Sequence, residues 1–347
     1  MEANPVAELV RRKTLRKLSE HLVKLCEDKG IRLSGYSPWK NDFRVAKEII
    51  SRWVFVNIAL GCMEDAVLPG PCNLDYIVRD IKNIGRVQEF DLCKKDVRAI
   101  LREGLDELER LDGGKMHIDW NGKFLFFEGV EAPKIPLSKH IEGRLKKRYV
   151  GDEGDYLTSV GALVMRMEAL GSYNNQLSVL PEIKDKLMKE LGINYEFFGS
   201  PINVDLPNYF SAFPDIDRVF GSGGSFFSLG VLPSRGLINP PYDEKIMEMT
   251  ATTLLYEFEN RPDDDLLYVV TIPSWQDNEE VYGLFQAWNI LKEMRWTRDV
   301  LHLQKANMPY IDHFTGKLVK AVATTIILLQ SDKSFEKNPD ISLESFF

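Results

Sequence analysis

Apolar residues in the first third of the chain recur at intervals of three and four positions. This spacing runs through Val6–Leu25, and it returns in Asp42–Met63 and in Leu92–Leu111. Side chains at this spacing share one face of an α-helix. Glycines follow the first and the last of these segments, at Gly30 and Gly113, as is common where helices end. The pattern predicts a mainly helical beginning of the chain.

A different pattern begins near residue 116. Apolar and polar residues alternate through Met116–Trp120, the dipeptide Asn121-Gly122 follows, and the alternation resumes at Phe124. An Asn-Gly pair between alternating runs is a strong signal for a β-hairpin. Helices followed by a hairpin occur in winged-helix domains, which commonly bind nucleic acid, and also in other α+β domains. We therefore expect residues 1–132 to form a helical accessory domain, winged-helix-like in one interpretation, that ends near Pro133–Pro136.

Short apolar runs alternate with helical segments in the rest of the chain. Such alternation predicts an α/β domain with a doubly wound, mostly parallel sheet, and these sheets bind ligands at the carboxyl ends of their strands. We expect this domain over residues 133–347. The predicted helices are Ser138–Tyr149, Asp155–Leu170, Leu180–Leu191, Asp243–Asn260 and Glu279–Met294. The predicted strands are Ile193–Phe198, part of Arg218–Phe227, Gly236–Asn239, Leu266–Ile272, Val300–Gln304 and Val322–Gln330.

Composition and charge exclude several classes of protein. Apolar residues make up 44% of the 347 residues, which is enough for a folded core and excludes a mainly disordered chain. The 44 basic and 52 acidic residues give a net charge of −8, which excludes a protein held to nucleic acid by its overall charge but allows a local basic groove. The five histidines show no metal-ligand spacing, so we expect no metal site.

Cysteine usage and the chain's apolar runs bear on the cellular compartment. No two of the four cysteines form a CxxC pair, and the first residues lack the basic and apolar regions of a signal peptide. The longest apolar run, Trp53–Met63, is too short to cross a bilayer. We therefore expect free thiols, no association with a membrane, and an intracellular protein of the nucleus or the cytoplasm.

The tetrad Asn239-Pro240-Pro241-Tyr242 stands between a predicted strand and a predicted helix. A proline-rich turn explains one proline, but it does not explain an asparagine before two prolines and an aromatic residue after them. The side-chain oxygen of Asn239 and the carbonyl of Pro240 can each accept one hydrogen of an exocyclic amine, and the prolines fix both acceptors in advance. Two such bonds make the nitrogen lone pair available, and the ring of Tyr242 offers a base a stacking surface. The tetrad indicates methyl transfer to an amine such as N6 of adenine.

Further motifs lie in order around this tetrad. Together with it, over residues 130–335, they resemble the family of cap-specific adenosine N6-methyltransferases that are like the phosphorylated-CTD-interacting factor. Tyr242 stands where that family usually has phenylalanine, and no WW module is visible at the start of the chain. The other matching motifs are Glu196–Asn203, Ser211–Asp215 with Asp217, Phe220–Ser222, Ile272–Trp275 and Leu328–Asp332.

The resemblance implies a Rossmann-like methyltransferase fold and S-adenosylmethionine as the methyl donor. It also implies that the acceptor is N6 of the first transcribed adenosine beside the 7-methylguanosine cap of RNA. Residues 1–125 match the family weakly, and residues 1–132 would then bind RNA or its cap. The structural alternative for Asp215 and Asp217 is a capped turn, and for Phe220 it is a position in the core. The expected cofactor-binding residues are Gly199, Ser200, Pro201, Asn203, Asp215, Asp217 and Phe220.

An RNA substrate also requires cations for its phosphates and aromatic rings for its bases. A basic cluster near the domain boundary and a tryptophan at a strand end are the expected contacts, although such clusters are often only solvated helix faces. Further candidates are Trp39 and Trp120 for stacking and His302 and His313 at the edge of the substrate site. The expected substrate-binding residues are Arg144, Lys147, Arg148 and Trp275.

Two alternatives remain open on the sequence. DNA adenine and glutamine side-chain methyltransferases also use Asn-Pro-Pro-Tyr, although the loop after the first strand lacks their glycine-rich pattern. A catalytically silent RNA-binding module with the same fold is the other alternative, and the intact tetrad argues against it.

Overall fold

The computed structural model describes residues 4–36, 40–111, 113–114, 116–129, 133–173, 176–278, 285–305, 307, 310–320 and 322–347. The chain forms two compact units, Met1–Asn175 and Gln176–Phe347, called here the N-terminal and C-terminal units. No helix within the described ranges is long and apolar enough to cross a membrane.

Helices dominate the N-terminal unit, as the apolar period predicted. Asn4 caps the first helix through its side-chain oxygen, which accepts hydrogen bonds from the amides of Val6 and Ala7. This helix packs against α2, α4 and α6 and buries Leu15, Leu18 and other residues of its apolar stripe. Helix α3 was not predicted. The helices are α1 (Pro5–Asp28), α2 (Asp42–Leu60), α3 (Asp75–Gly85), α4 (Lys94–Glu109), α5 (Lys139–Arg148) and α6 (Tyr156–Ala169).

The predicted hairpin is confirmed. Strands β1 (Ile118–Trp120) and β2 (Phe124–Phe127) pair antiparallel, and the side chain of Asn121 accepts hydrogen bonds from two amides of the turn. A third strand, β3 (Lys134–Pro136), pairs with β2, and α6 packs against β1 and β3. Because these contacts hold residues 133–173 in the N-terminal unit, the boundary between units lies at 175/176, later than the predicted boundary.

A six-stranded mixed sheet forms the centre of the C-terminal unit. Its strand order is β6-β5-β7-β8-β12-β9; neighbours from β6 to β8 run parallel, whereas β12 is antiparallel to both β8 and β9. Three of the five neighbouring pairs in this order are therefore parallel. The strands are β5 (Tyr195–Glu196), β6 (Asn208–Tyr209), β7 (Arg235–Ile238), β8 (Leu267–Pro273), β9 (Thr297–Leu303) and β12 (Thr324–Gln330).

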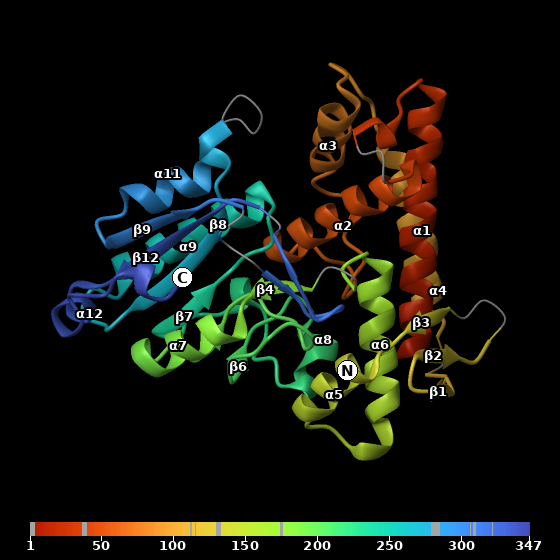
Figure 1. Ribbon diagram of the computed structural model, residues 1–347. Helices are drawn as coiled ribbons and strands as arrows, with labels where there is room; N and C mark the ends of the chain where they lie inside the picture. The colour runs from red at the N-terminus through yellow and green to blue at the C-terminus, as the bar shows by residue number, and fades with distance from the viewer. Residues whose placement is uncertain are drawn as a thin grey trace. The chain divides into compact units, whose positions relative to one another are not determined.

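Helices cover both faces of this sheet (Figure 1). Tyr268 and Val270 of β8 join the core under α9 (Glu244–Asn260) and α11 (Gln286–Glu293). Leu267 and Val269 point to the opposite face and join the core under α7 (Pro181–Leu191). Since both faces are covered, every residue of β8 and β12 is buried, which explains their largely apolar sequences. The short helices α8 (Pro214–Asp217) and α12 (Asp332–Lys337) complete the unit.

Some elements differ from the prediction. Of the strand predicted in part of Arg218–Phe227, only an isolated parallel bridge between Ser222 and Tyr209 forms. The rest of the segment forms two 3₁₀ turns, and Gly221 and Gly224 have positive φ angles that interrupt an extended chain. Residues 279–284 of the predicted helix Glu279–Met294 lie outside the described residues. A second sheet, too short per strand to show a pattern, was not predicted; it consists of β4 (Leu177–Val179), β10 (Tyr310–Asp312) and β11 (Lys317–Val319).

Candidate active site

The tetrad Asn239–Tyr242 follows the carboxyl end of β7 and leads directly into α9. The carboxylate of Asp243 caps that helix by accepting hydrogen bonds from the amides of Lys245 at 3.0 Å and Ile246 at 3.2 Å. The amide of Asp243 in turn donates to the carbonyl of Pro241 at 2.7 Å. The two prolines and this capped turn fix the backbone on which the tetrad's acceptors stand.

Both proposed acceptors of the tetrad are unengaged. Neither the side chain of Asn239 nor the carbonyl of Pro240 makes a hydrogen bond with any residue that the structure describes. Asn239 is half-buried and Pro240 is buried. Buried and half-buried polar groups normally have partners, so these two oxygens are suited to bind the amino group of a ligand.

The hydroxyl of Tyr242 is locked into a chain of hydroxyls. It lies 2.9 Å from the hydroxyl of Tyr310 on β10, which is hydrogen-bonded at 2.6 Å to Thr324 at the start of β12. Burial, followed by the neighbouring Tyr310, raises the pKa of Tyr242 well above its ordinary value. The hydroxyl of Tyr242 therefore stays neutral, and its hydrogen bond to Tyr310 orients the half-buried ring. No sequence pattern links Tyr242 to Tyr310 or Thr324, because these residues come from elements distant in the chain.

Trp275 lies at the same edge of the sheet as the tetrad. Strands β7 and β8 are parallel neighbours, with Ile238 opposite Val270, and Trp275 follows the carboxyl end of β8. Its half-buried indole packs against Phe285, with ring centroids 5.4 Å apart. The structure therefore brings this predicted substrate residue and the tetrad to neighbouring strand ends.

A polar cluster accompanies Trp275 at this edge. The hydroxyl of Thr325 lies 2.8 Å from the hydroxyl of Ser274 and 3.0 Å from Nδ1 of His302, and it accepts a hydrogen bond from Gln276 at 2.7 Å. His302 thus lies at the edge where we expected the substrate.

The predicted cofactor loop Gly199–Asn203 follows the carboxyl end of β5. Ser200 organises it: its hydroxyl accepts from the amides of Ile202 and Asn203, and its own amide donates to the side chain of Asn203 at 2.8 Å. Gly199 passes so close to the ring of Tyr209 that a Cβ there would lie 3.1 Å from it. The loop is held in one shape by its own bonds, and Pro201 within it is buried.

The other predicted cofactor residues follow β6. Asp215 is half-buried in α8, whereas Asp217 is buried. The ring of Phe220 is fully buried, and its carbonyl accepts a hydrogen bond from the hydroxyl of Tyr209 at 3.1 Å. Phe220 therefore occupies a core position, the structural alternative that the sequence left open.

The predicted basic contacts belong to the N-terminal unit. Arg144, Lys147 and Arg148 lie in the last part of α5, where Lys147 is exposed and the two arginines are half-buried. Trp120 of the same unit donates from its indole to the carbonyl of Leu137 at 3.0 Å, which fits a packing role. Trp39 lies outside the described residues.

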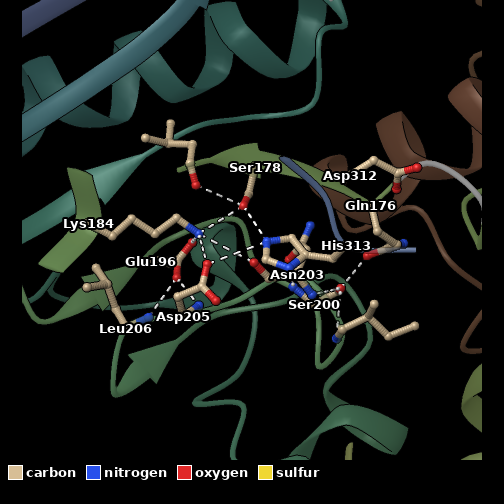
Figure 2. A network of polar contacts seen from close by, with 12 residues as sticks. Gln176, Ser178, Lys184, Glu196, Ser200, Asn203, Asp205, Leu206, Asp312 and His313 are labelled. Atoms are coloured by element: carbon tan, nitrogen blue, oxygen red, sulfur yellow. Dashed lines mark hydrogen bonds and ion pairs between the residues drawn. The ribbon is translucent and has the colours of Figure 1, made fainter. Parts of the chain in front are cut away.

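His313 lies in a buried polar network beside the predicted cofactor loop Gly199–Asn203 (Figure 2). Its ring is 1% exposed, and its Nε2 lies 2.8 Å from the hydroxyl of Ser178 and 3.5 Å from the carboxylate of Asp205. Lys184 and Glu196 complete the network. These partners are separated along the chain, so no sequence pattern links them.

A family model described as "Phosphorylated CTD interacting factor 1 WW domain" matches residues 146–313. Two proteins named mRNA (2'-O-methyladenosine-N(6)-)-methyltransferase, from Homo sapiens and Mus musculus, are 29% and 30% identical to the chain over 240 residues. Each match covers 64% of this chain, which spans 33% of the length of each relative. The resemblance to the cap-specific adenosine N6-methyltransferases that the ordered motifs predicted is therefore confirmed.

Proposed function

We propose that the chain is an S-adenosylmethionine-dependent methyltransferase that acts on N6 of the adenosine next to the cap of an RNA. The observation that carries the proposal is the pair of unengaged acceptors, the Asn239 side chain and the Pro240 carbonyl, at the carboxyl end of β7. The names of the human and mouse relatives support the choice of acceptor.

The sheet supports a doubly wound, Rossmann-like methyltransferase fold. From β5 the chain continues to β6 on one side and afterwards to β7 on the other, so the strand order reverses between β5 and β7. Ligands of α/β sheets bind at such a switch point, outside the carboxyl ends of the strands. The Gly199–Asn203 loop follows one of these two strands and the tetrad follows the other. The methyl donor and the acceptor base would then bind at the ends of two neighbouring strands, β5 and β7.

The residues at this point fit S-adenosylmethionine. Gly199 lets the ring of Tyr209 pack closely against the start of the loop, the hydrogen bonds of Ser200 hold the loop in shape, and the half-buried Asp215 supplies a carboxylate for a hydroxyl or an ammonium group. Glu196 is engaged in an ion pair with Lys184, so it serves the loop instead of the ligand. When bound, S-adenosylmethionine supplies a methyl group on a positively charged sulfur.

The chain's own residues would prepare the amine for attack. Asn239 and Pro240 accept the two amine hydrogens and draw the nitrogen towards a tetrahedral form, and no reorganisation is needed because the acceptors are already fixed. Tyr242 holds the base by stacking, with its hydroxyl occupied by Tyr310. The neutral Tyr242 is not required as a base, since the nitrogen loses its proton after the methyl has moved.

The N-terminal unit would bind the RNA or its cap. Arg144, Lys147 and Arg148 give α5 a basic end that suits phosphates. The winged-helix interpretation of this unit stays a prediction.

One assay with labelled methyl donor tests the proposal. The acceptors are capped RNA that begins with adenosine, with and without a 2'-O-methyl group, capped RNA that begins with guanosine, uncapped RNA, duplex DNA and protein. We expect label on N6 of the first adenosine of capped RNA only. Equal labelling of uncapped RNA would overturn cap dependence. Labelling of DNA or protein would support the alternative of a DNA adenine or glutamine side-chain methyltransferase. RNA binding without labelling of any acceptor would support the silent module.

A further inference from the structure

A buried ion-pair network lies beside the cofactor loop in the C-terminal unit (Figure 2). At its centre is Lys184 of α7, whose side chain has no exposed surface. Its Nζ lies 2.7 Å from the carboxylate of Glu196 and 2.9 Å from that of Asp205, and it donates to the hydroxyl of Ser178 at 3.1 Å. Lysine is almost never fully buried unless it is paired, so this position has a specific role.

The two carboxylates come from positions on either side of the cofactor loop Gly199–Asn203. Glu196 is the last residue of β5, and its second oxygen accepts hydrogen bonds from the amides of Asp205 at 2.6 Å and Leu206 at 2.9 Å. Lys184 also donates to the carbonyl of Asn203 at 3.4 Å. A single ammonium group thus contacts a residue three positions before the loop, the last residue of the loop and a residue two positions beyond it.

The small sheet supports the same loop from another side. The hydroxyl of Ser200 donates to the side chain of Gln176 at 2.5 Å, and the carbonyl of Gln176 accepts from the amide of His313. The ring of His313 reaches the hydroxyl of Ser178, which Lys184 also contacts. The small sheet and its flanking residues thus contact the loop through Gln176 at Ser200 and contact Lys184 through Ser178 of β4.

We propose that Lys184 is a positioning residue for the methyl donor. It touches neither cofactor nor substrate; by pairing with Glu196 and Asp205 together it keeps Gly199–Asn203 in the shape that binds the donor. The inference rests on the proposed function, because it assigns the donor to this loop. It predicts a loss of donor affinity without a comparable loss of the methylation rate at saturation.

We expect replacement of Lys184 to weaken donor binding because it upsets the charge balance of this buried network. Without Lys184 two carboxylates would stand side by side without their cation, and removing one member of a buried ion pair is strongly destabilising. The loop between Glu196 and Asp205 would shift to admit water to them. Replacing Glu196 by glutamine as well removes one of the two charges while keeping an acceptor for the Asp205 and Leu206 amides, so the double variant should recover part of the affinity.

The test measures binding and turnover separately in the full chain. S-adenosylhomocysteine binding is followed by calorimetry, and KM for S-adenosylmethionine and kcat are measured on capped RNA. For Lys184→Met we expect Kd and KM to rise at least tenfold while kcat changes less than threefold. Lys184→Met combined with Glu196→Gln should bind at least threefold tighter than Lys184→Met alone.

A matched control removes an equally buried cation from the N-terminal unit. The guanidinium of Arg166 has no exposed surface and pairs with Glu8 at 2.5 Å. Arg166→Met should lower the melting temperature and leave the Kd for S-adenosylhomocysteine within twofold of the parent chain. This control separates loss of a buried charge from loss of the loop's support.

Three outcomes would overturn the inference: a folded Lys184→Met chain with Kd within twofold of the parent, a fall in kcat at unchanged Kd, or a double variant no better than Lys184→Met. If Lys184→Met does not fold, Asp205→Asn decides instead. It removes one ion pair at a partly exposed site and should raise Kd at least threefold, and an unchanged Kd refutes the role of Lys184. Failure of the parent chain to bind the ligand would overturn the proposed function itself, which is a distinguishable result.

Discussion

Asn239 is the acceptor of the tetrad that a substitution can remove, because the other acceptor is a main-chain carbonyl. Loss of one preorganised polar group at a reacting centre costs about 10²–10³ in turnover. We expect Asn239→Ala to lower kcat by this amount while donor binding and the melting temperature stay unchanged. Asn260→Ala, at the exposed end of α9, is the matched control and should be silent. Retention of more than about a tenth of the rate would contradict the role of Asn239.

Tyr242 combines a stacking ring with a hydroxyl that binds Tyr310. Tyr242→Phe keeps the ring and loses one hydrogen bond, so we expect a rate within a few fold of the parent and a stability loss of about 1 kcal/mol. Tyr242→Ala also loses stacking worth ~1–3 kcal/mol, and KM for RNA or kcat should suffer about 10- to 100-fold. Steady-state kinetics and urea unfolding of both variants check this. Equal kinetic effects of the two substitutions would exclude stacking as the function of the ring.

Packing between elements gives a prediction at Gly236 of β7. A Cβ at this position would lie 1.9 Å from the ring of Phe197, which is 1% exposed and stacks on Phe210 with centroids 5.4 Å apart. Gly236→Ala must displace this ring, and overpacking of a core typically costs 1–3 kcal/mol. The free energy of unfolding should fall by about that amount.

The control for this prediction is Gly230→Ala, where a Cβ would meet no atom within 4 Å and φ is not positive. Its free energy of unfolding should stay within about 0.5 kcal/mol of the parent value. Equal unfolding free energies for the two variants would show that β5 and β7 tolerate a side chain between them.

Among the elements, length and periodicity decided what the sequence could predict. The long helices and the buried strands β8 and β12 follow from their apolar patterns, and the tetrad was placed correctly at a strand end before α9. Strands β4, β10 and β11 have three residues each, too few to establish a period. The partners of Tyr242 and the network of Lys184 are contacts between distant segments, which depend on the tertiary fold and leave no local signal.

For the whole molecule, buried acids with raised pKa values predict sensitivity to alkali. Burial raises the pKa of Cys26 to about 11, and burial raises the pKa of Tyr242, Tyr268 and Tyr310 above their ordinary value. The folded state therefore keeps protons that the unfolded state releases. The contribution of these groups to stability is constant below their unfolded pKa values and falls as the pH rises above them.

Urea unfolding at a series of pH values from 8 to 11 measures this effect. The free energy of unfolding should decline from about pH 9 upward, where unfolded thiols and then unfolded tyrosines ionise. Cys26→Ala removes one of these acids from the N-terminal unit. The free energy of unfolding of this variant should therefore fall less steeply between about pH 9 and 10, whatever its value at pH 8. A parent chain with the same unfolding free energy at pH 8 and 10.5 would refute the prediction.

The order of strands also governs how the protein can be made. Strand β12 enters the sheet between β8 and β9, although it is the last of the six to be synthesised. A nascent chain that has emerged only as far as β9 exposes the hydrogen-bonding edge of β8, and unpaired edges invite pairing with other chains. Completion of the sheet must therefore wait until β12 has left the ribosome, and premature termination before Thr324 would leave an aggregation-prone fragment instead of a smaller folded unit.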